Sequence, residues 1–124
     1  MNLVDSSGWL EYFADGPNAE FFAPPIEDTE RLLVPTICVL EVFKRVMQQR
    51  GEQAALQATA IMQQGHLVGL DVATAVFAAK LGLQARLPLA DSVVMATARA
   101  HNAVVWTQDG DFEGLEDVRF RKKR

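Results

Sequence analysis

Five acidic residues occupy positions where the sequence predicts a strand to end or a helix to begin. They are Asp5, Glu41, Asp91, Asp109 and Asp111. Mg²⁺ and Mn²⁺ prefer carboxylate oxygens as ligands, and clustered carboxylates repel one another until a cation compensates their charge. A bound divalent cation also lowers the pKa of a coordinated water and stabilises the oxygens of a phosphodiester. If these acids meet in the fold, they predict metal-dependent hydrolysis of a phosphodiester.

Each acid taken alone has a simpler explanation, because Asp at the start of a helix caps it and stabilises its dipole. The segment Asp5-Ser6-Ser7 fits such a cap. Glu41 and Asp91 fit it less well, since each lies in a largely apolar stretch where a solvated acid is not expected. The whole set therefore favours a shared site over five separate caps.

Short apolar segments alternate with segments of helical periodicity along the chain. Strands are predicted at residues 3–4, 32–34, 66–70, 103–106 and 118–120. Helices are predicted from Trp9 to Phe13, between Thr36 as N-cap and Gly51, and over 52–64, 72–83 and 89–100, with Pro24-Pro25 in a polar loop. Uniformly apolar strands separated by helices indicate a parallel sheet covered on both faces. Ligands of such sheets bind outside the carboxyl ends of the strands, which is where the acids stand.

The composition places the chain among globular proteins of one domain. It has 124 residues, of which 49% are hydrophobic and 23% are charged, close to the globular average. The single cysteine, Cys38, excludes an internal disulfide and a cysteine-built zinc site, and two histidines are too few for a histidine-built metal centre. Because no apolar run approaches the roughly 20 residues of a membrane helix, and Met1 to Asp5 lacks the basic segment of a signal peptide, we expect a cytoplasmic protein that contacts no membrane.

The charge is distributed unevenly along the chain. The net charge is −4, from 16 acidic and 12 basic residues, but five bases lie in the last six positions. These are Arg119, Arg121, Lys122, Lys123 and Arg124. An acidic body argues against holding nucleic acid by charge alone, although phosphates can still be met through a bound cation. Because chain ends are usually mobile, the sequence favours a solubilising role for the basic end over an RNA contact.

Four motifs, in their order and spacing, resemble the PIN-domain family and within it the VapC-type toxin ribonucleases. The motifs are Leu3-Val4-Asp5-Ser6-Ser7, Leu40-Glu41-Val42, the segment Leu89–Ala98 and the segment Val105–Phe112. The resemblance covers essentially the whole chain and implies a single PIN domain over residues 1–124. It implies a three-layer α/β/α sandwich with a central, mostly parallel sheet of four to five strands.

The resemblance also implies an activity and a set of site residues. The implied activity is Mg²⁺- or Mn²⁺-dependent cleavage of RNA, in which a cation-activated water hydrolyses the phosphodiester. The implied catalytic acids are Asp5, Glu41, Asp91 and Asp109, of which Asp5, Asp91 and Asp109 hold the metal. Ser6 or Ser7 and Thr107 match supporting hydroxyls of the family, and Asp111 competes with Asp109 as the fourth acid. The implied partners are an RNA substrate, a cognate VapB-like antitoxin and a second copy of the chain.

Several other side chains have either a functional or a structural explanation. Four bases are candidate RNA contacts or parts of a solvated helix face: Lys44, Arg45, Arg86 and Arg99. Trp9 and Phe13 either line a groove for the antitoxin or pack in the core, and the core is favoured for Trp9. The histidines His66 and His101 are expected to be structural, and Cys38 to be a small buried hydrophobe.

Two further classes of protein compete with the nuclease. One is a non-catalytic PIN-like binding subunit, which the intact set of acids disfavours. The other is a receiver-type signalling domain, which has a similar length and alternation of elements. A receiver needs paired acids after its first strand and a lysine after its last, whereas here Asp5 is followed by two serines and no lysine follows Trp106-Thr107.

Overall fold

A computed structural model describes all 124 residues of the chain. Its centre is a five-stranded sheet in which every pair of neighbouring strands is parallel. The strands follow the spatial order β3-β2-β1-β4-β5. They are β1 (Asn2–Val4), β2 (Leu32–Pro35), β3 (His66–Val68), β4 (Val104–Thr107) and β5 (Val118–Phe120).

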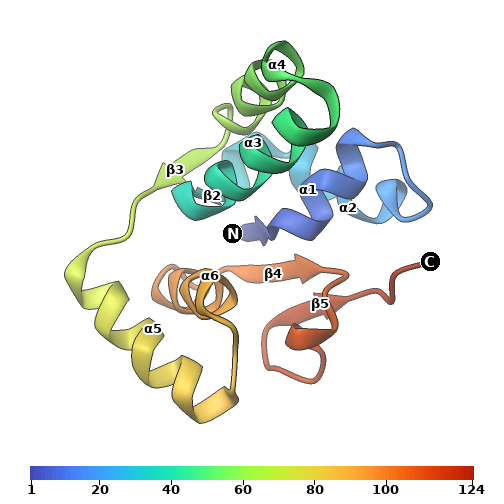
Figure 1. Cartoon of the computed structure of the whole chain (residues 1–124). Helices are drawn as coiled ribbons and strands as arrows, with labels where there is room; N and C mark the ends of the chain where they lie inside the picture. The colour runs from blue at the N-terminus through green and yellow to red at the C-terminus, as the bar shows by residue number, and fades with distance from the viewer.

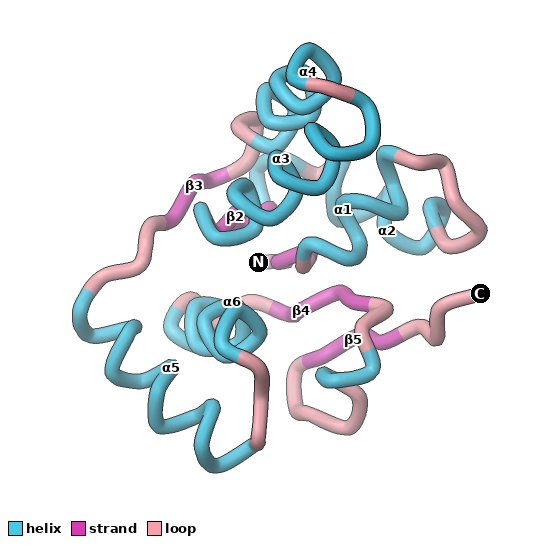
Figure 2. The backbone as a smooth tube through the Cα atoms, viewed as in Figure 1, coloured by secondary structure: helices cyan, strands magenta, loops and turns pink.

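Helices cover both faces of this sheet and complete a three-layer α/β/α sandwich (Figures 1 and 2). One layer contains α1 (Ser6–Phe13), α2 (Ala19–Glu27), α3 (Thr36–Arg50) and α4 (Glu52–Met62). The other contains α5 (Val72–Ala85) and α6 (Leu89–Ala100), and two short 3₁₀ turns, η1 (Thr29–Arg31) and η2 (Gly110–Phe112), precede β2 and follow β4. The predicted fold class is therefore confirmed.

The order of the strands creates a crevice at the carboxyl edge of the sheet. From β1 the chain moves outward to β2 and β3, and after β3 it crosses to the other side of β1 to form β4. Strands β1 and β4 are thus neighbours whose following segments leave in opposite directions. In open α/β sheets this is the point where ligands bind. Asp5 follows β1 at this point, and Thr107 ends β4 beside it, because Val4 pairs with Trp106.

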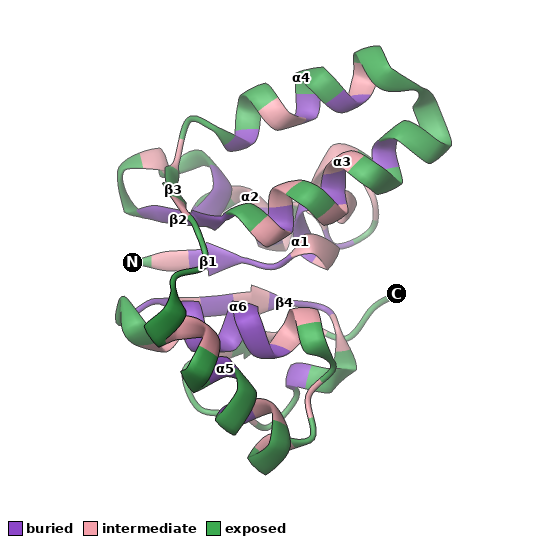
Figure 3. Ribbon diagram, turned by 60° about the vertical axis from the view of Figure 1, so that its left-hand side comes forward, coloured by how far each residue is buried: buried purple, intermediate pink, exposed green.

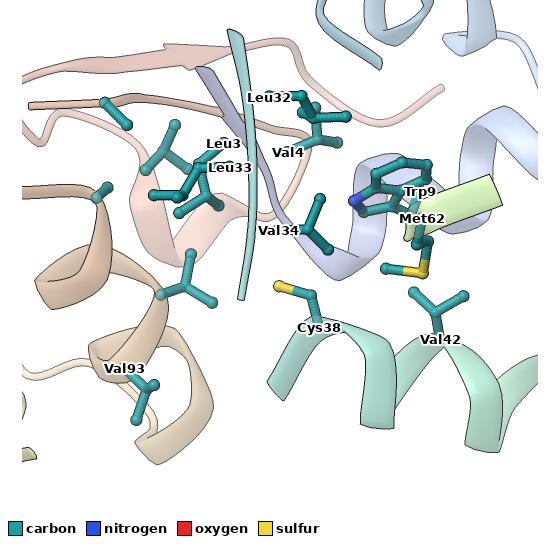
Figure 4. Close-up of a cluster of buried hydrophobic side chains, with 14 of the residues drawn as sticks. Leu3, Val4, Trp9, Leu32, Leu33, Val34, Cys38, Val42, Met62 and Val93 are labelled. Atoms are coloured by element: carbon teal, nitrogen blue, oxygen red, sulfur yellow. The ribbon is translucent and has the colours of Figure 1, made fainter. Parts of the chain in front are cut away.

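The core lies between the sheet and the two helical layers (Figure 3). Leu3, Val4 and Val105 in the central strands are fully buried. On one side, Trp9 and Met62 lie near Val42 of α3 (Figure 4). Burial of large apolar side chains stabilises a fold by about 1.5–3 kcal/mol each, so this central part is where the stability of the domain resides.

The two inner helices next to the crevice have little freedom to move. In α6 every residue from Ser92 to Ala98 is buried, and the helix contacts β2, β4 and α5. At the start of α1, Gly8 lies so close to Phe22 that a Cβ atom there would be 2.6 Å from the ring. Close packing therefore fixes the positions of Asp91, in the first turn of α6, and of Asp5, which caps α1.

The structure corrects three details of the sequence interpretation. Pro24 and Pro25 lie inside α2 and not in a polar loop, because burial of Phe22, Pro25 and Ile26 offsets the backbone hydrogen bonds that proline removes. The N-cap of α3 is Pro35, and its side chain makes no capping bond, so Thr36 is the first helical residue. Strand β3 ends at Val68 and is largely exposed, since it forms the edge of the sheet.

The remaining predicted elements are present with boundaries shifted by a few residues, and the bounds predicted for α6 and β5 are those observed. None of the helices combines the length and the apolar character that crossing a membrane requires.

Candidate active site

Asp5 lies at the end of β1, where it both caps a helix and faces the crevice. Its Oδ1 accepts hydrogen bonds from the Ser7 hydroxyl at 2.7 Å and from the Gly8 backbone N–H at 3.1 Å. Its Oδ2 accepts a bond from Thr107 at 2.8 Å. The side chain is only 4% exposed. The helix cap and the shared site, which the sequence offered as alternatives, are therefore one arrangement.

Burial raises the pKa of Asp5 to about 6, because an ionised carboxylate is costly where water is excluded. The hydrogen bonds from Ser7, Thr107 and Gly8 oppose this rise, and the charge of Asp109 adds to it. The donors thus hold the carboxylate in a fixed orientation, while its pKa lies much closer to neutral pH than that of an ordinary aspartate. A nearby positive charge would favour its ionised form.

Thr107 connects the first and fourth strands through its hydroxyl group. The hydroxyl donates to Asp5 and accepts a bond of 2.9 Å from the backbone N–H of Asp109. Because both contacts are short and Thr107 is fully buried, Asp5 and the backbone of Asp109 keep a fixed separation. The predicted supporting role of Thr107 has a geometric basis in these two bonds.

Glu41 approaches the crevice from α3. Its Oε1 accepts a hydrogen bond of 2.6 Å from the hydroxyl of Ser6, which begins α1. The two serines after Asp5 therefore have different partners, since Ser7 donates to Asp5 itself. Ser6 links the second acid to the first helix, and Ser7 fixes the first acid.

Three acids from α6 and η2 meet on the other side of the crevice. Carboxylate oxygens of Asp91, Asp109 and Asp111 all lie within 4.8 Å of one another. Burial, the charges of Asp109, Asp111 and Asp5, and a side-chain hydrogen bond with Asp111 together raise the pKa of Asp91 to about 7. Asp109 is itself oriented by the Asp111 backbone N–H, which donates to its Oδ1 at 2.9 Å. Asp91 thus experiences strong repulsion from like charges when all of these groups are ionised.

A cavity of about 70 Å³ brings the predicted acids together. It is lined by Asp5, Ser6, Ser7, Glu41, Asp91, Val94 and Asp109. Four acidic side chains and two hydroxyls from four separate parts of the chain thus face one small space. Asp111 does not line this cavity and instead flanks it through its contact with Asp91 and Asp109.

The family profile described as PIN domain matches residues 3–118. The chain belongs to the PIN-domain family. Among curated proteins, none matches the chain in sequence.

Solved structures show the same fold. A toxin–antitoxin complex from Klebsiella pneumoniae matches at 21% identity, with 96% of each chain covered and a TM-score of 0.79. The sarcin–ricin loop-cleaving toxin VapC20 of Mycobacterium tuberculosis matches at 15% identity and a TM-score of 0.79, covering 94% of this chain and 95% of that one. A DNA-bound VapBC complex from Salmonella typhimurium matches at 15% identity and a TM-score of 0.76, covering 98% of both.

The donor set of this PIN domain fits a hard divalent cation. All ligand atoms offered are carboxylate oxygens, and no histidine or thiolate faces the cavity. Such oxygens suit Mg²⁺ and Mn²⁺, which usually bind one or two carboxylates and keep several waters. A cation would also remove the repulsion from Asp109, Asp111 and Asp5, which together with burial raises the pKa of Asp91.

The candidate basic residues are placed at different distances from the crevice. Lys44 and Arg45 are exposed on α3, about one turn beyond Glu41. Arg86 ends α5 in the left-handed conformation, just before the helix that carries Asp91. Arg99 is in the last turn of α6 and lines a separate hollow with Val104, at the amino end of β4. The geometry therefore separates Arg99 from the acids.

The structure adds two residues that the sequence analysis did not single out. Gln108 is buried and bonds to Ser7 through both its backbone N–H and its side chain, at 3.4 Å each. Asn18, also buried, donates to Gln108 at 3.0 Å. Gln108 lies between Thr107 and Asp109 in one of the four family motifs, and this position marks it as a candidate site residue. Asn18 lies 90 positions away, and nothing in the local sequence marks it.

The remaining residues of interest are structural. Trp9 is fully buried, as favoured, and Phe13 stacks on it while lining an apolar groove between α1, α3 and α4. His66 and His101 each bond a backbone carbonyl oxygen, of Glu30 and Thr97 respectively. Cys38 is buried, and this burial raises the pKa of its thiol.

Proposed function

We propose that this PIN domain is a metal-dependent endoribonuclease that acts as the toxin of a toxin–antitoxin pair. The observation that carries the proposal is the cavity in which Asp5, Glu41, Asp91 and Asp109 converge. It lies at the crevice where the topology of the sheet favours ligand binding. The similar structures support the same function, since they include a toxin that cleaves the sarcin–ricin loop.

In the proposed site Asp5, Asp91 and Asp109 hold Mg²⁺ or Mn²⁺. A cation bound there would lower the pKa of a coordinated water and stabilise the negative charge on the phosphodiester oxygens. The protein orients the ligands: Ser7, Gly8 and Thr107 fix Asp5, and the Asp111 N–H fixes Asp109. The proton that Asp91 retains near neutral pH must leave its carboxyl group before that group can serve as a ligand.

No side chain near the cavity is suited to act as a covalent nucleophile. The hydroxyls of Ser6 and Ser7 donate to carboxylates, and no histidine faces them to act as a base. A buried thiol with a raised pKa, as in Cys38, is a poor nucleophile because the thiolate is the reactive form. These features favour attack by water over a covalent intermediate.

The proposal includes two protein partners. A VapB-like antitoxin is supported by the similar structures, several of which are toxin–antitoxin complexes. A homodimer is supported by exposed apolar side chains along the segment from β3 to α5, namely Leu67, Leu70, Val72 and Val76. Light scattering on the purified chain at micromolar concentration should give the mass of a dimer, and a mass near 13.7 kDa would contradict this part.

Conditional expression in a bacterial host tests the activity. Growth should stop, and mapping of RNA 5′ ends across the transcriptome should reveal discrete new ends. An Asp91→Asn variant, expressed to the same level, should produce neither. New ends that are equally abundant with Asp91→Asn would overturn the assignment of the site. Soluble, folded wild-type protein that causes no arrest, and that cleaves no total bacterial RNA in vitro with Mg²⁺ or Mn²⁺, would favour a non-catalytic binding subunit.

A further inference from the structure

A second, larger hollow adjoins the acidic cavity. Its volume is about 600 Å³, and among the residues lining it are Ser7, Asp109, Lys122 and Lys123. Ser7 and Asp109 line the acidic cavity as well. The two spaces therefore share a wall, and a chain that enters the acidic cavity can continue past the two lysines. We call this hollow the lysine groove.

The lysine side of this groove is built into the fold through its backbone. Asn18, which is 0% exposed, donates from Nδ2 to the backbone carbonyl of Lys122 at 3.1 Å and to the side chain of Gln108 at 3.0 Å. The backbone N–H of Arg121 donates to the carbonyl of Thr107 at 3.1 Å. The segment after β5 is thus tied to the two residues that precede Asp109.

The basic residues of β5 and of the segment after it divide into two groups. Arg119 and Arg121 lie over the rings of Trp106 and Phe21, with 4.9 and 4.6 Å from guanidinium carbon to ring centroid. Arg121 also forms an ion pair with Glu20, with 3.9 Å between Nη1 and Oε1. Lys122 and Lys123 are exposed and have no acidic partner within 4.0 Å. The arginines attach the segment to the protein, and the lysines remain available to a ligand.

We propose that Lys122 and Lys123 bind the phosphate backbone of the RNA substrate next to the phosphodiester that is cleaved. The inference rests on the proposed nuclease function, and it reverses the expectation that the basic end only solubilises the chain. Lys122 and Lys123 share the groove with Asp109 and Glu113. When the proposed cation neutralises Asp109, the two unpaired ammonium groups leave the groove with a positive balance that suits an anionic ligand. We infer a polymeric ligand because the groove is continuous with the acidic cavity, so one strand can occupy both spaces.

This contact would position the substrate without taking part in the chemistry. Lysine ammonium groups supply sequence-independent attraction to phosphates. In a body that is otherwise acidic, two such charges beside the cavity also select the direction in which the strand leaves it. Their removal should therefore weaken binding and raise KM, while kcat stays within about twofold.

A binding measurement tests the proposal directly. The probe is a fluorescein-labelled single-stranded RNA of about 12 nucleotides, titrated in Ca²⁺ by fluorescence anisotropy at several salt concentrations. Lys122→Ala/Lys123→Ala should raise Kd roughly tenfold and reduce the slope of log K against log salt by about 1.4, or about 0.7 per lost phosphate contact. Lys122→Arg/Lys123→Arg should restore both values.

The matched control removes two exposed bases elsewhere. Arg31 ends the short η1 turn just before β2, and Lys80 lies on α5. Neither residue lines the groove. Arg31→Ala/Lys80→Ala changes the net charge by the same amount and should leave both Kd and slope unchanged. Equal weakening by the two double variants would overturn the proposal, because it would show a general effect of charge.

Cleavage of total bacterial RNA in Mg²⁺ separates this inference from the function on which it rests. If the wild type cleaves and the lysine variant matches it in KM, Kd and slope, the lysine contact is wrong and the nuclease stands. If the wild type binds with a lysine-dependent slope but does not cleave, the groove is supported and the nuclease is overturned. A wild type that neither binds nor cleaves overturns both.

Discussion

The two sides of the acidic cavity hold their carboxylates in different ways. On the side formed by β1 and β4, Asp5 accepts three hydrogen bonds, and the hydroxyl of Thr107 extends this network to the next strand. On the side formed by α6 and η2, Asp91 faces Asp109 and Asp111, and its side-chain hydrogen bond with Asp111 favours the protonated form. We refer to these as the bonded side and the repulsive side.

In the proposed metal site, this difference lets one side position its carboxylate precisely while the other side supplies the attraction for a cation. The bonded side stays in place with or without a ligand, because neighbouring donors in the same fold satisfy its carboxylate. The repulsive side is stable only when a proton or a cation compensates its charge.

The largest expected effect is on cation affinity. Asp91→Asn keeps the size of the side chain but removes a ligand, so we expect at least a hundredfold loss of Mn²⁺ affinity and about a thousandfold loss of cleavage rate. Isothermal titration with Mn²⁺ and single-turnover cleavage measure the two effects.

The matched control for this variant is Asp117→Asn. Asp117 is exposed and has a positive φ of 59°, which asparagine adopts readily, and it lines a hollow at the other end of β4. Both quantities should stay at the wild-type values. A Mn²⁺ affinity that falls equally in both variants would show that the cation is attracted by net charge alone.

The repulsive side should also make the metal-free protein less stable at higher pH. The pKa values of Asp91 and Asp5, about 7 and about 6 in the folded state, exceed the value of about 3.9 in an unfolded chain. The folded state therefore binds more protons between about pH 4 and pH 7, and the free energy of unfolding falls as pH rises through this window. We expect Asp91 to account for about 1–2 kcal/mol of this fall, after allowance for solvent screening.

Thermal unfolding in EDTA at pH 5 and pH 7.5 checks this. The wild type should melt several degrees higher at pH 5, and Asp91→Asn should reduce the difference while Asp117→Asn leaves it intact. Mn²⁺ should restore stability at pH 7.5 in the wild type and in Asp117→Asn, but not in Asp91→Asn. A melting temperature that rises with pH in EDTA and is insensitive to Asp91→Asn would contradict the idea of a repulsive side.

The bonded side is tested by Thr107→Val, which preserves shape and removes the hydroxyl. The change leaves Asp5 Oδ2 without its donor and the Asp109 N–H without its acceptor, so we expect a loss of about 1–3 kcal/mol in stability and roughly tenfold in cleavage rate. Urea unfolding and single-turnover cleavage measure the effects.

Thr97→Val is the control for this substitution. Thr97 is also buried, but its hydroxyl donates only to the carbonyl of Val93 within α6. It should change stability slightly and cleavage by less than twofold. If the two threonine variants lose the same activity, the loss follows from destabilisation and not from the orientation of Asp5.

The repulsive side could be predicted more fully from the sequence than the bonded side. Asp91, Asp109 and Asp111 lie within a few residues of predicted strand ends or helix starts, and a parallel sheet brings such positions to one edge. The strands themselves were visible because short apolar segments end at turn-forming residues. For these parts, local pattern and topology together determine the position of each acid.

Much of the bonded side depends on contacts between residues distant in the sequence. Asn18 reaches Gln108 and Lys122 across 90 and 104 positions, and no periodicity encodes such a bond. The sequence predicts no helix at α2, which Asn18 precedes, because Pro24 and Pro25 argue against a helix locally, whereas the burial of Phe22, Pro25 and Ile26 favours one. The sequence also leaves open which of Ser6 and Ser7 supports Asp5, because this depends on how α1 is rotated about its axis.

The smallest expected effect comes from the bond that joins the two helices at the edge of the cavity. Ser6→Ala removes the donor to Glu41 but leaves that carboxylate half-exposed and able to bind water, so it should cost only about 0.5–1 kcal/mol in stability and about threefold in cleavage rate. Ser7→Ala removes a donor from the buried Asp5 and should cost several times more activity. Single-turnover cleavage of one RNA by both variants compares them, and an order reversed between the serines would place the critical hydroxyl on Glu41 and not on Asp5.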